Sequence, residues 1–144
     1  MTIILAEYRH PDDYEAVTAL WTRSGLTLYP VDAPAVMART VARNPGLFLL
    51  LRDGDALVGA VLGTDDGRQL WVHHLAVDPA YRGQGLATRL MRELADRARE
   101  RGIPVMMLLV ARDNTTAIRL YEKLAWLAVP EILFMVRPLT DNEA

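Results

Sequence analysis

The chain has 144 residues, of which 51% are hydrophobic and 24% are charged, and this balance predicts one folded domain over residues 1–144. Sixteen basic and 18 acidic residues leave a net charge of −2, which argues against a broad nucleic-acid-binding surface. The sequence has no cysteine, no apolar run long enough to span a bilayer and no signal-peptide pattern, so we exclude thiolate chemistry, disulfides and a membrane protein and expect a cytoplasmic one.

The first half of the chain changes from helical to strand periodicity near residue 45. Apolar residues at helical spacing mark two helices, and Asp-Gly turns then separate short apolar runs. The predicted elements are a strand over Ile3–Tyr8, helices over Pro11–Gly25 and Pro34–Asn44, and strands over Leu47–Leu51, Ala56–Gly63 and Gln69–Val77. The last three predict an antiparallel meander.

The second half begins with the clearest amphipathic helix of the chain. Leucine or alanine recurs every four residues from Leu86 to Ala98, and Gly102 ends the helix. The remaining predicted elements are a buried strand over Pro104–Val110, a helix over Thr115–Leu124 and a strand over Trp126–Val136. The order β-α-α-β-β-β-α-β-α-β predicts an α/β (α+β) fold with a mixed central sheet of six to seven strands and about four flanking helices.

A glycine-bearing turn joins the Gln69–Val77 strand to the amphipathic helix. Gly83 and Gly85 let a ligand approach the backbone closely, and the helix that follows offers unpaired N–H groups at the positive end of its dipole. This pattern is typical of a phosphate or pyrophosphate cradle, although a plain strand–turn–helix has the same spacing. Thr88 and the residues after Gly85 do not fit a dinucleotide fingerprint or a Walker loop.

Two blocks of the sequence resemble the GNAT superfamily of N-acetyltransferases, and the overall pattern is similar to a small bacterial single-domain member. The first block is Leu75-Ala76-Val77-Asp78-Pro79-x-Tyr81-Arg82-Gly83-x-Gly85-Leu86-Ala87, which contains the family pattern Gln/Arg-x-x-Gly-x-Gly/Ala. The second is Asn114-x-x-Ala117-x-x-Leu120-Tyr121, which resembles the family's Asn-x-x-Ala-x-x-Leu-Tyr. The resemblance covers residues 45–138, and it departs at Ala125-Trp126, where the family usually has Gly-Phe.

The resemblance implies acetyl-CoA as co-substrate and no metal. It implies that the strands Gln69–Val77 and Pro104–Val110 splay apart to admit the pantetheine arm. The arm would pair with the backbone of three strand residues, and the pyrophosphate would lie on backbone amides of the following loop. The implied residues are Leu75, Ala76 and Val77 for the arm, and Arg82, Gly83, Gln84, Gly85, Leu86 and Ala87 for the pyrophosphate. Asn114 would also contact the arm, and an ordinary helix N-cap is the alternative interpretation.

Two residues are catalytic candidates under the same resemblance. Tyr121 would protonate the departing thiolate, and a packed core aromatic is the alternative. His73 would be the base for the attacking amine, since no carboxylate lies in the Pro104–Val110 strand; a water chain is the alternative. Strand alternation predicts that His73 and His74 lie on opposite faces, with His73 on the face of Leu75 and Val77.

The implied reaction is acetyl transfer from acetyl-CoA to a primary amine by direct attack in a ternary complex. The acceptor, a small-molecule or peptide amine, is expected near Trp21–Asp32, where Tyr29 and Asp32 are candidates and Trp21 is interpreted as core. The apolar run Leu124–Met135 indicates a possible homodimer interface. The alternatives are a CoA-binding sensor or regulatory module and, less favoured, a protein-interaction domain on the same fold.

Overall fold

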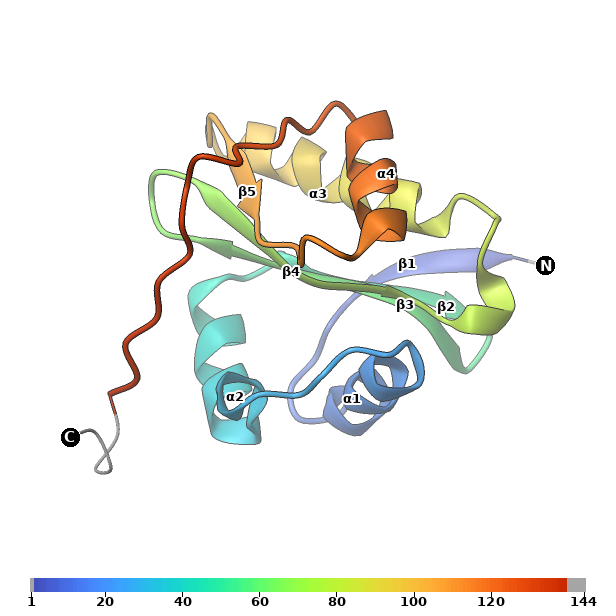
Figure 1. The fold of residues 1–144 in the computed structure, drawn as a ribbon. Coiled ribbons are helices and arrows are strands. Elements are labelled where there is room, and N and C mark those ends of the chain that lie inside the picture. The colour runs from blue at the N-terminus through green and yellow to red at the C-terminus, as the bar shows by residue number, and fades with distance from the viewer. Residues whose placement is uncertain (1, 140–144) are drawn as a thin grey trace. The chain divides into compact units, whose positions relative to one another are not determined.

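A five-stranded sheet in the order β1-β2-β3-β4-β5 organises residues 2–109 (Figure 1). The structure is a computed structural model that describes residues 2–139. Its strands are β1 (Ile3–Glu7), β2 (Phe48–Asp53), β3 (Ala56–Asp65), β4 (Leu70–Val77) and β5 (Met106–Leu108). Its α-helices are α1 (Tyr14–Arg23), α2 (Pro34–Arg43), α3 (Leu86–Glu100) and α4 (Thr115–Lys123), and Pro30–Asp32 and Pro79–Tyr81 form short 3₁₀ turns. Neighbouring strands are antiparallel except β4 and β5, which are parallel, so the predicted mixed α/β fold is confirmed.

The chain divides into two compact units, residues 2–109 and 110–139. The first unit holds all five strands with α1, α2 and α3, and the second holds α4 and the residues that follow it. The single domain over residues 1–144 therefore stays a prediction. Within residues 2–139, none of the helices has the length and apolar content that a membrane crossing requires.

The two faces of the sheet are covered by different helices. Figure 1 shows α1 and α2 on one face and α3 on the other. The α1/α2 face is a core of buried side chains that includes Trp21, Phe48 and Leu62. On the α3 face, a Cβ atom at Gly63 would lie 2.9 Å from Leu94 Cδ1. Glycine at this position of β3 therefore lets α3 pack closely against the sheet.

The strand predicted over Trp126–Val136 is wrong. These residues form no strand in the structure, and their large side chains are exposed, as for Leu127 (88%) and Met135 (84%). A strand requires a neighbouring backbone edge to pair with, and an apolar composition does not supply one. The described sheet accordingly has five strands instead of six or seven.

The strand predicted over Pro104–Val110 forms only over Met106–Leu108. It is also not buried, because β5 is the last strand of the sheet and its side chains are intermediate or exposed. Because β5 is short, it pairs with only part of β4. The candidate site begins in the part of β4 that β5 leaves unpaired.

Candidate functional site

The second half of β4 has a free edge. Strand β5 pairs with only three residues of β4, in the pairs Leu70–Met106, Trp71–Met107 and Val72–Leu108. From His73 to Val77, β4 pairs within residues 2–109 only with β3. The Val77 carbonyl accepts hydrogen bonds at 3.4 Å from Ser24 Oγ and Arg82 Nε. The other backbone groups on the outer side of this half have no strand partner within residues 2–109, so an extended chain could add to the sheet there as a further strand. This edge contains the residues predicted to pair with the pantetheine arm, and their role stays a prediction.

The loop that follows β4 is fixed by a carboxylate. Asp78 Oδ1 accepts a hydrogen bond from the Ala80 N–H at 2.8 Å, and Asp78 Oδ2 lies 2.8 Å from Arg23 Nε on α1. The Ala80 hydrogen bond, followed by the bond from Arg23, holds the pKa of Asp78 below its usual range. Tyr81 further along donates its hydroxyl to Asp53 Oδ2 at 2.7 Å. The loop is thus tied to α1 and to the end of β2.

The turn between this loop and α3 leaves its backbone accessible. Gly83 and Gly85 have φ angles of +79° and +76°, which glycine adopts without strain, and a Cβ atom at either would meet no other atom within 4 Å. Gly85 is the N-cap of α3 and supplies no side-chain cap to the first-turn N–H groups. Leu86 is buried and anchors the helix start, whereas Arg82 and Gln84 are exposed. An anionic group can therefore reach these N–H groups directly.

A β-bulge interrupts β4 at the two histidines. Ala60 of β3 pairs with Ala76 and Leu62 pairs with His73, so two residues of β4 lie opposite the single residue between Ala60 and Leu62. His74 within the bulge has a φ of +48°. The extra residue shifts the alternation of side chains between the two faces of the sheet.

Both histidines consequently lie on the α1/α2 face. His73 pairs with Leu62 of the α1/α2 core, and its Nε2 lies 2.8 Å from Thr64 Oγ1. The His74 ring lies 4.4 Å from the Trp21 ring of α1. The prediction that the two histidines face opposite ways, with His73 on the face of Leu75 and Val77, is therefore wrong, because strand alternation does not hold across a bulge.

Asp32 reaches His74 from the segment between α1 and α2. The Asp32 side chain is buried, and its Oδ1 and Oδ2 lie 3.0 and 3.1 Å from His74 Nε2. From the sequence, Asp32 was predicted only as a candidate to attract an amine, and its contact with His74 was not predicted. Trp21 is fully buried, so its interpretation as a core residue is confirmed, whereas the Tyr29 side chain is 58% exposed.

The protein environment also changes the acid–base behaviour of His73. Burial, followed by the neighbouring His74, lowers the pKa of His73, and the nearby Asp32 opposes part of this effect. His73 is therefore a neutral imidazole near pH 7, which is the form that accepts a proton. Among residues 2–139, no group of three or more His, Asp or Glu side chains is placed to hold a metal ion.

In the second unit, Asn114 caps α4. Its side chain accepts a hydrogen bond from the Ala117 N–H at 3.2 Å, so the N-cap interpretation of Asn114 is confirmed. Contact with a cofactor arm is compatible with this cap and stays a prediction.

The C-terminal end of α4 keeps a tight turn without glycine. The Trp126 N–H donates to the Tyr121 carbonyl at 3.0 Å and the Ala125 N–H to the Glu122 carbonyl at 3.1 Å, which is a Schellman motif. Ala125 occupies the left-handed position of the motif, with φ +70°. The Tyr121 and Trp126 rings lie 5.9 Å apart, and burial raises the pKa of Tyr121. The Tyr121 hydroxyl therefore carries its proton at neutral pH.

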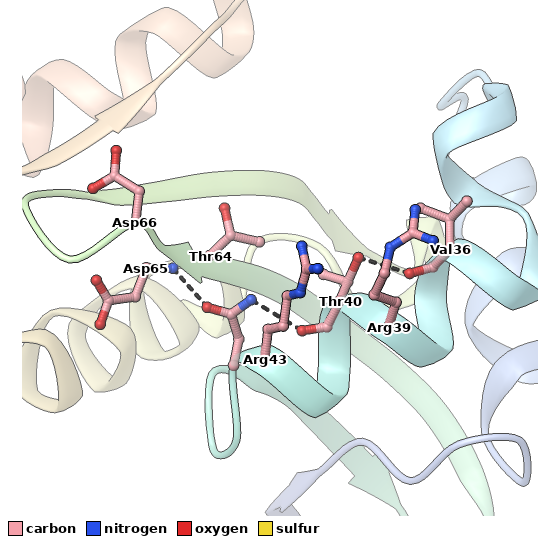
Figure 2. Close-up of a pocket in the computed structure, with 8 residues that line it drawn as sticks. Val36, Arg39, Thr40, Arg43, Thr64, Asp65 and Asp66 are labelled. Atoms are coloured by element: carbon pink, nitrogen blue, oxygen red, sulfur yellow. Dashed lines mark hydrogen bonds between the residues drawn. The ribbon is translucent and has the colours of Figure 1, made fainter.

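A cavity of about 410 Å³ lies beside α2 and the β3–β4 turn. Asn44 lines it, donates to the Thr40 carbonyl at 2.9 Å and accepts from the Asp65 N–H at 2.7 Å. Figure 2 shows the labelled residues that line the cavity, with both hydrogen bonds as dashed lines. Arg39 and Arg43, one helical turn apart, also line it. Sequence analysis did not predict this cavity, which shares Thr64 with the hydrogen bond to His73.

The sequence and the fold both match known proteins. Residues 12–126 match the profile of the Acetyltransferase (GNAT) family. An acetyltransferase of Pectobacterium atrosepticum is 37% identical over 133 residues, which span 92% of this chain and 94% of that protein.

Among solved structures, Ard1 from Thermoplasma volcanium has a TM-score of 0.80 at 24% identity, over 90% of this chain and 85% of its own. The PaiA N-acetyltransferase from Thermoplasma acidophilum, in complex with coenzyme A, has a TM-score of 0.76 at 18% identity, over 85% and 88%. At these identities the two structures show the fold alone.

Proposed function

Because the chain belongs to the Acetyltransferase (GNAT) family and is an acyltransferase, we propose that it transfers the acetyl group of acetyl-CoA to a primary amine. The observation that carries the proposal is the free edge of β4 after Val72, which continues into the accessible glycine turn before α3. An extended arm and a pyrophosphate are the two chemical features that such a strand and turn would bind.

The residues of the first unit fit the co-substrate in chain order. The backbone of Leu75–Val77 would pair with the pantetheine arm, and the N–H groups of Arg82–Ala87 would bind the pyrophosphate. Asp78 keeps these two segments in register through its bonds to Ala80 and Arg23. A backbone N–H near Val77 would stabilise the oxyanion that develops when the thioester carbonyl is attacked.

The proposed reaction removes two protons from the ammonium nitrogen of the acceptor, one before and one after its attack, and supplies one proton to the departing thiolate. An alkyl ammonium has a pKa of about 10.4, so the acceptor amine must lose a proton before its nitrogen attacks the thioester carbon. The sequence predicts His73 as the base that takes this proton. His74 is a second candidate because it lies on the same face of the sheet. As the C–S bond breaks, the thiolate would take the proton of the Tyr121 hydroxyl. The raised pKa of Tyr121 keeps that proton in place until the thiolate forms.

The acceptor is proposed to be a small-molecule or peptide amine near the Tyr29–Asp32 segment. A homodimer is also proposed, supported by the exposed apolar side chains of residues 127–139, such as Leu133 (81%). Sedimentation equilibrium of the wild-type protein and of Leu133→Asp tests this, with a dimer expected only for the former. The absence of cysteine fits the reducing cytoplasm that we propose as the location.

Tyr121→Phe tests the proposed function against the alternative of a CoA-binding regulatory module. The assay follows thiol release from acetyl-CoA over a panel of primary amines, with acetyl-CoA affinity measured by calorimetry. We expect Tyr121→Phe to bind acetyl-CoA like the wild type and to lose about 10²–10⁴-fold in turnover. Tyr8→Phe, a buried tyrosine of the α1/α2 core, is the matched control and should keep its turnover. Binding without turnover in the wild-type protein would support the regulatory module instead.

A further inference from the structure

His74 has an unusual backbone for a strand residue. A φ of +48° is strained for a residue with a Cβ atom and persists only where the surroundings hold it. His74 lies inside β4 and not in a turn, so the chain gains no reversal of direction from it. What this conformation achieves is the placement of the His74 ring against Trp21 and Asp32.

Asp32 is itself held from several sides. Its Oδ2 accepts the Tyr29 N–H at 2.9 Å, and its backbone carbonyl accepts the Tyr14 hydroxyl at 2.6 Å. An ionised carboxylate only accepts hydrogen bonds, so its contact with His74 Nε2 assigns the proton of a neutral His74 ring to Nε2. The lone pair of the ring then lies on Nδ1. Carboxylates orient catalytic histidines in acyl-transfer enzymes in the same manner.

The Nδ1 atom of His74 remains accessible. The His74 side chain is 17% exposed, and its hydrogen bonds in the structure are made by Nε2. Within residues 2–139, the buried side-chain nitrogen or oxygen without a partner is Trp21 Nε1. His74 Nδ1 is therefore not sealed inside the protein, and it can meet an external group.

The neighbouring His73 is differently placed. Its Nε2 contacts the neutral Thr64 hydroxyl, and none of the carboxylates within residues 2–139 hydrogen-bonds to its ring. His74 also directly precedes Leu75–Val77, the free edge of β4. Of the two histidines on this face, His74 alone combines an orienting carboxylate with a position next to that edge.

We propose that His74, oriented by Asp32, is the base that takes the proton from the acceptor ammonium. The inference rests on the proposed acetyl transfer and names the residue that starts it. The ammonium N–H bond breaks and its proton bonds to His74 Nδ1, while the freed lone pair forms the bond to the thioester carbon. The C–S bond breaks, and the thiolate takes the Tyr121 proton to become the free thiol. The acylated nitrogen then loses a second proton to water to give the neutral amide. The Tyr121 oxygen regains a proton from water and His74 releases its proton to solvent, so one proton is released for each acetyl group transferred. Asp32 is a positioning residue in this scheme.

The test compares His74→Asn, Asp32→Asn and His73→Asn across pH. The matched control is His10→Asn, because His10 is the third histidine of the chain and its Nδ1 lies 2.8 Å from the Tyr8 hydroxyl. Asparagine tolerates positive φ better than most residues, which favours folding of His74→Asn. Among residues 2–139, the titratable groups that interact with His74 are Asp32 and His73, and the Tyr14 hydroxyl donates to the Asp32 carbonyl. The variants Asp32→Asn, His73→Asn and Tyr14→Phe separate the contributions of these groups to the pH–rate profile.

We expect His74→Asn to lose about 10²–10⁴-fold in kcat with unchanged acetyl-CoA affinity. The pH–rate profile of His74→Asn should follow the free-amine fraction of the acceptor alone. Asp32→Asn should lose rate and keep a pH–rate profile of the wild-type shape. His73→Asn should lose less rate than His74→Asn, and the control His10→Asn should stay within a few-fold of the wild type. A loss confined to His73→Asn, or a wild-type rate in His74→Asn, would overturn the proposal.

A second measurement does not depend on activity or on the His74 variant. The ¹⁵N shifts of the His74 ring report which nitrogen carries the proton. For the neutral His74 ring we expect the Nε2–H form in the wild-type protein and a mixture of the two forms in Asp32→Asn. An Nδ1–H form in the wild type would contradict the orientation of His74 by Asp32. Failure of the wild-type protein to acetylate any amine, with the Nε2–H form present, would instead count against the proposed function.

Discussion

The two halves of β4 show how one strand supports the fold at one end and leaves backbone free for a ligand at the other. Leu70–Val72 pairs with both β3 and β5, and Leu70 and Val72 are buried. Within residues 2–109, Ala76 and Val77 pair with β3 alone, and Leu75 and Val77 are only half-buried. The bulge at His74 separates the halves. The candidate site therefore begins where β5 stops pairing with the backbone of β4.

The largest effect on stability is expected when a leucine in each half of β4 is replaced by alanine. Leu70→Ala should lower the free energy of unfolding by about 2–5 kcal/mol, because Leu70 is fully buried between β3 and β5. Leu75→Ala removes a half-buried side chain and should cost less than half as much. Urea unfolding of both variants measures the difference, and equal losses would contradict the division of β4 into two halves.

Asn114 tests the same distinction in the second unit, because it has a structural role and a proposed ligand role. Asn114→Ala should lower the free energy of unfolding of this unit by about 1 kcal/mol through loss of the cap on the Ala117 N–H. Asn114→Ser retains a capping oxygen and should restore most of that stability. If Asn114 also contacts the pantetheine arm, acetyl-CoA affinity should fall in both variants; recovery of affinity with the cap would leave Asn114 a structural residue alone.

A substitution at Ala125 should have a smaller effect on stability, and it should stabilise the protein. Ala125→Gly should raise the free energy of unfolding by about 0.5–1 kcal/mol, because glycine adopts the φ of +70° without the clash of a Cβ atom. Thermal unfolding followed by circular dichroism measures the change. A lower midpoint would show that Ala125 is better suited than glycine to the Schellman turn.

The smallest effect on stability is expected at Asp78, whose carboxylate stabilises the loop after the free half of β4. A carboxyl whose pKa is lowered by folding stabilises the protein above its unfolded pKa of about 3.9, and this contribution is lost as the pH falls through the lower folded pKa. Asp78→Asn should therefore be less stable than the wild type near pH 7, with a difference that shrinks as the pH falls below the unfolded pKa of about 3.9. A difference that persists in acid would assign the effect to something other than the ionised carboxylate.

The parts of the molecule that sequence predicted are those set by local patterns. The stripe from Leu86 to Ala98 fixed α3, the Asp53-Gly54 turn fixed the β2–β3 hairpin, and Gly83 with Gly85 marked the turn before α3. Each depends on residues within a few positions of one another. The free edge of β4 was expected only through the resemblance to a family.

The parts that sequence missed depend on pairing between distant segments. A period of two carries no sign of one inserted residue, so the bulge at His74 and the shared face of the two histidines were not predictable. Asp32 and His74 are 42 positions apart in the chain. The apolar run Trp126–Val136 has the composition of a strand and no paired edge.

Calorimetric titration with acetyl-CoA tests the central claim, that the free edge of β4 and the glycine turn bind this co-substrate. The proteins are the wild type, Gly85→Glu and the control Gly67→Glu, which places the same charge at a φ of +90° in the open turn between β3 and β4. We predict micromolar-range binding by the wild type and Gly67→Glu, and none by a folded Gly85→Glu. No binding by the folded wild-type protein, or equal losses in both variants, would contradict the account.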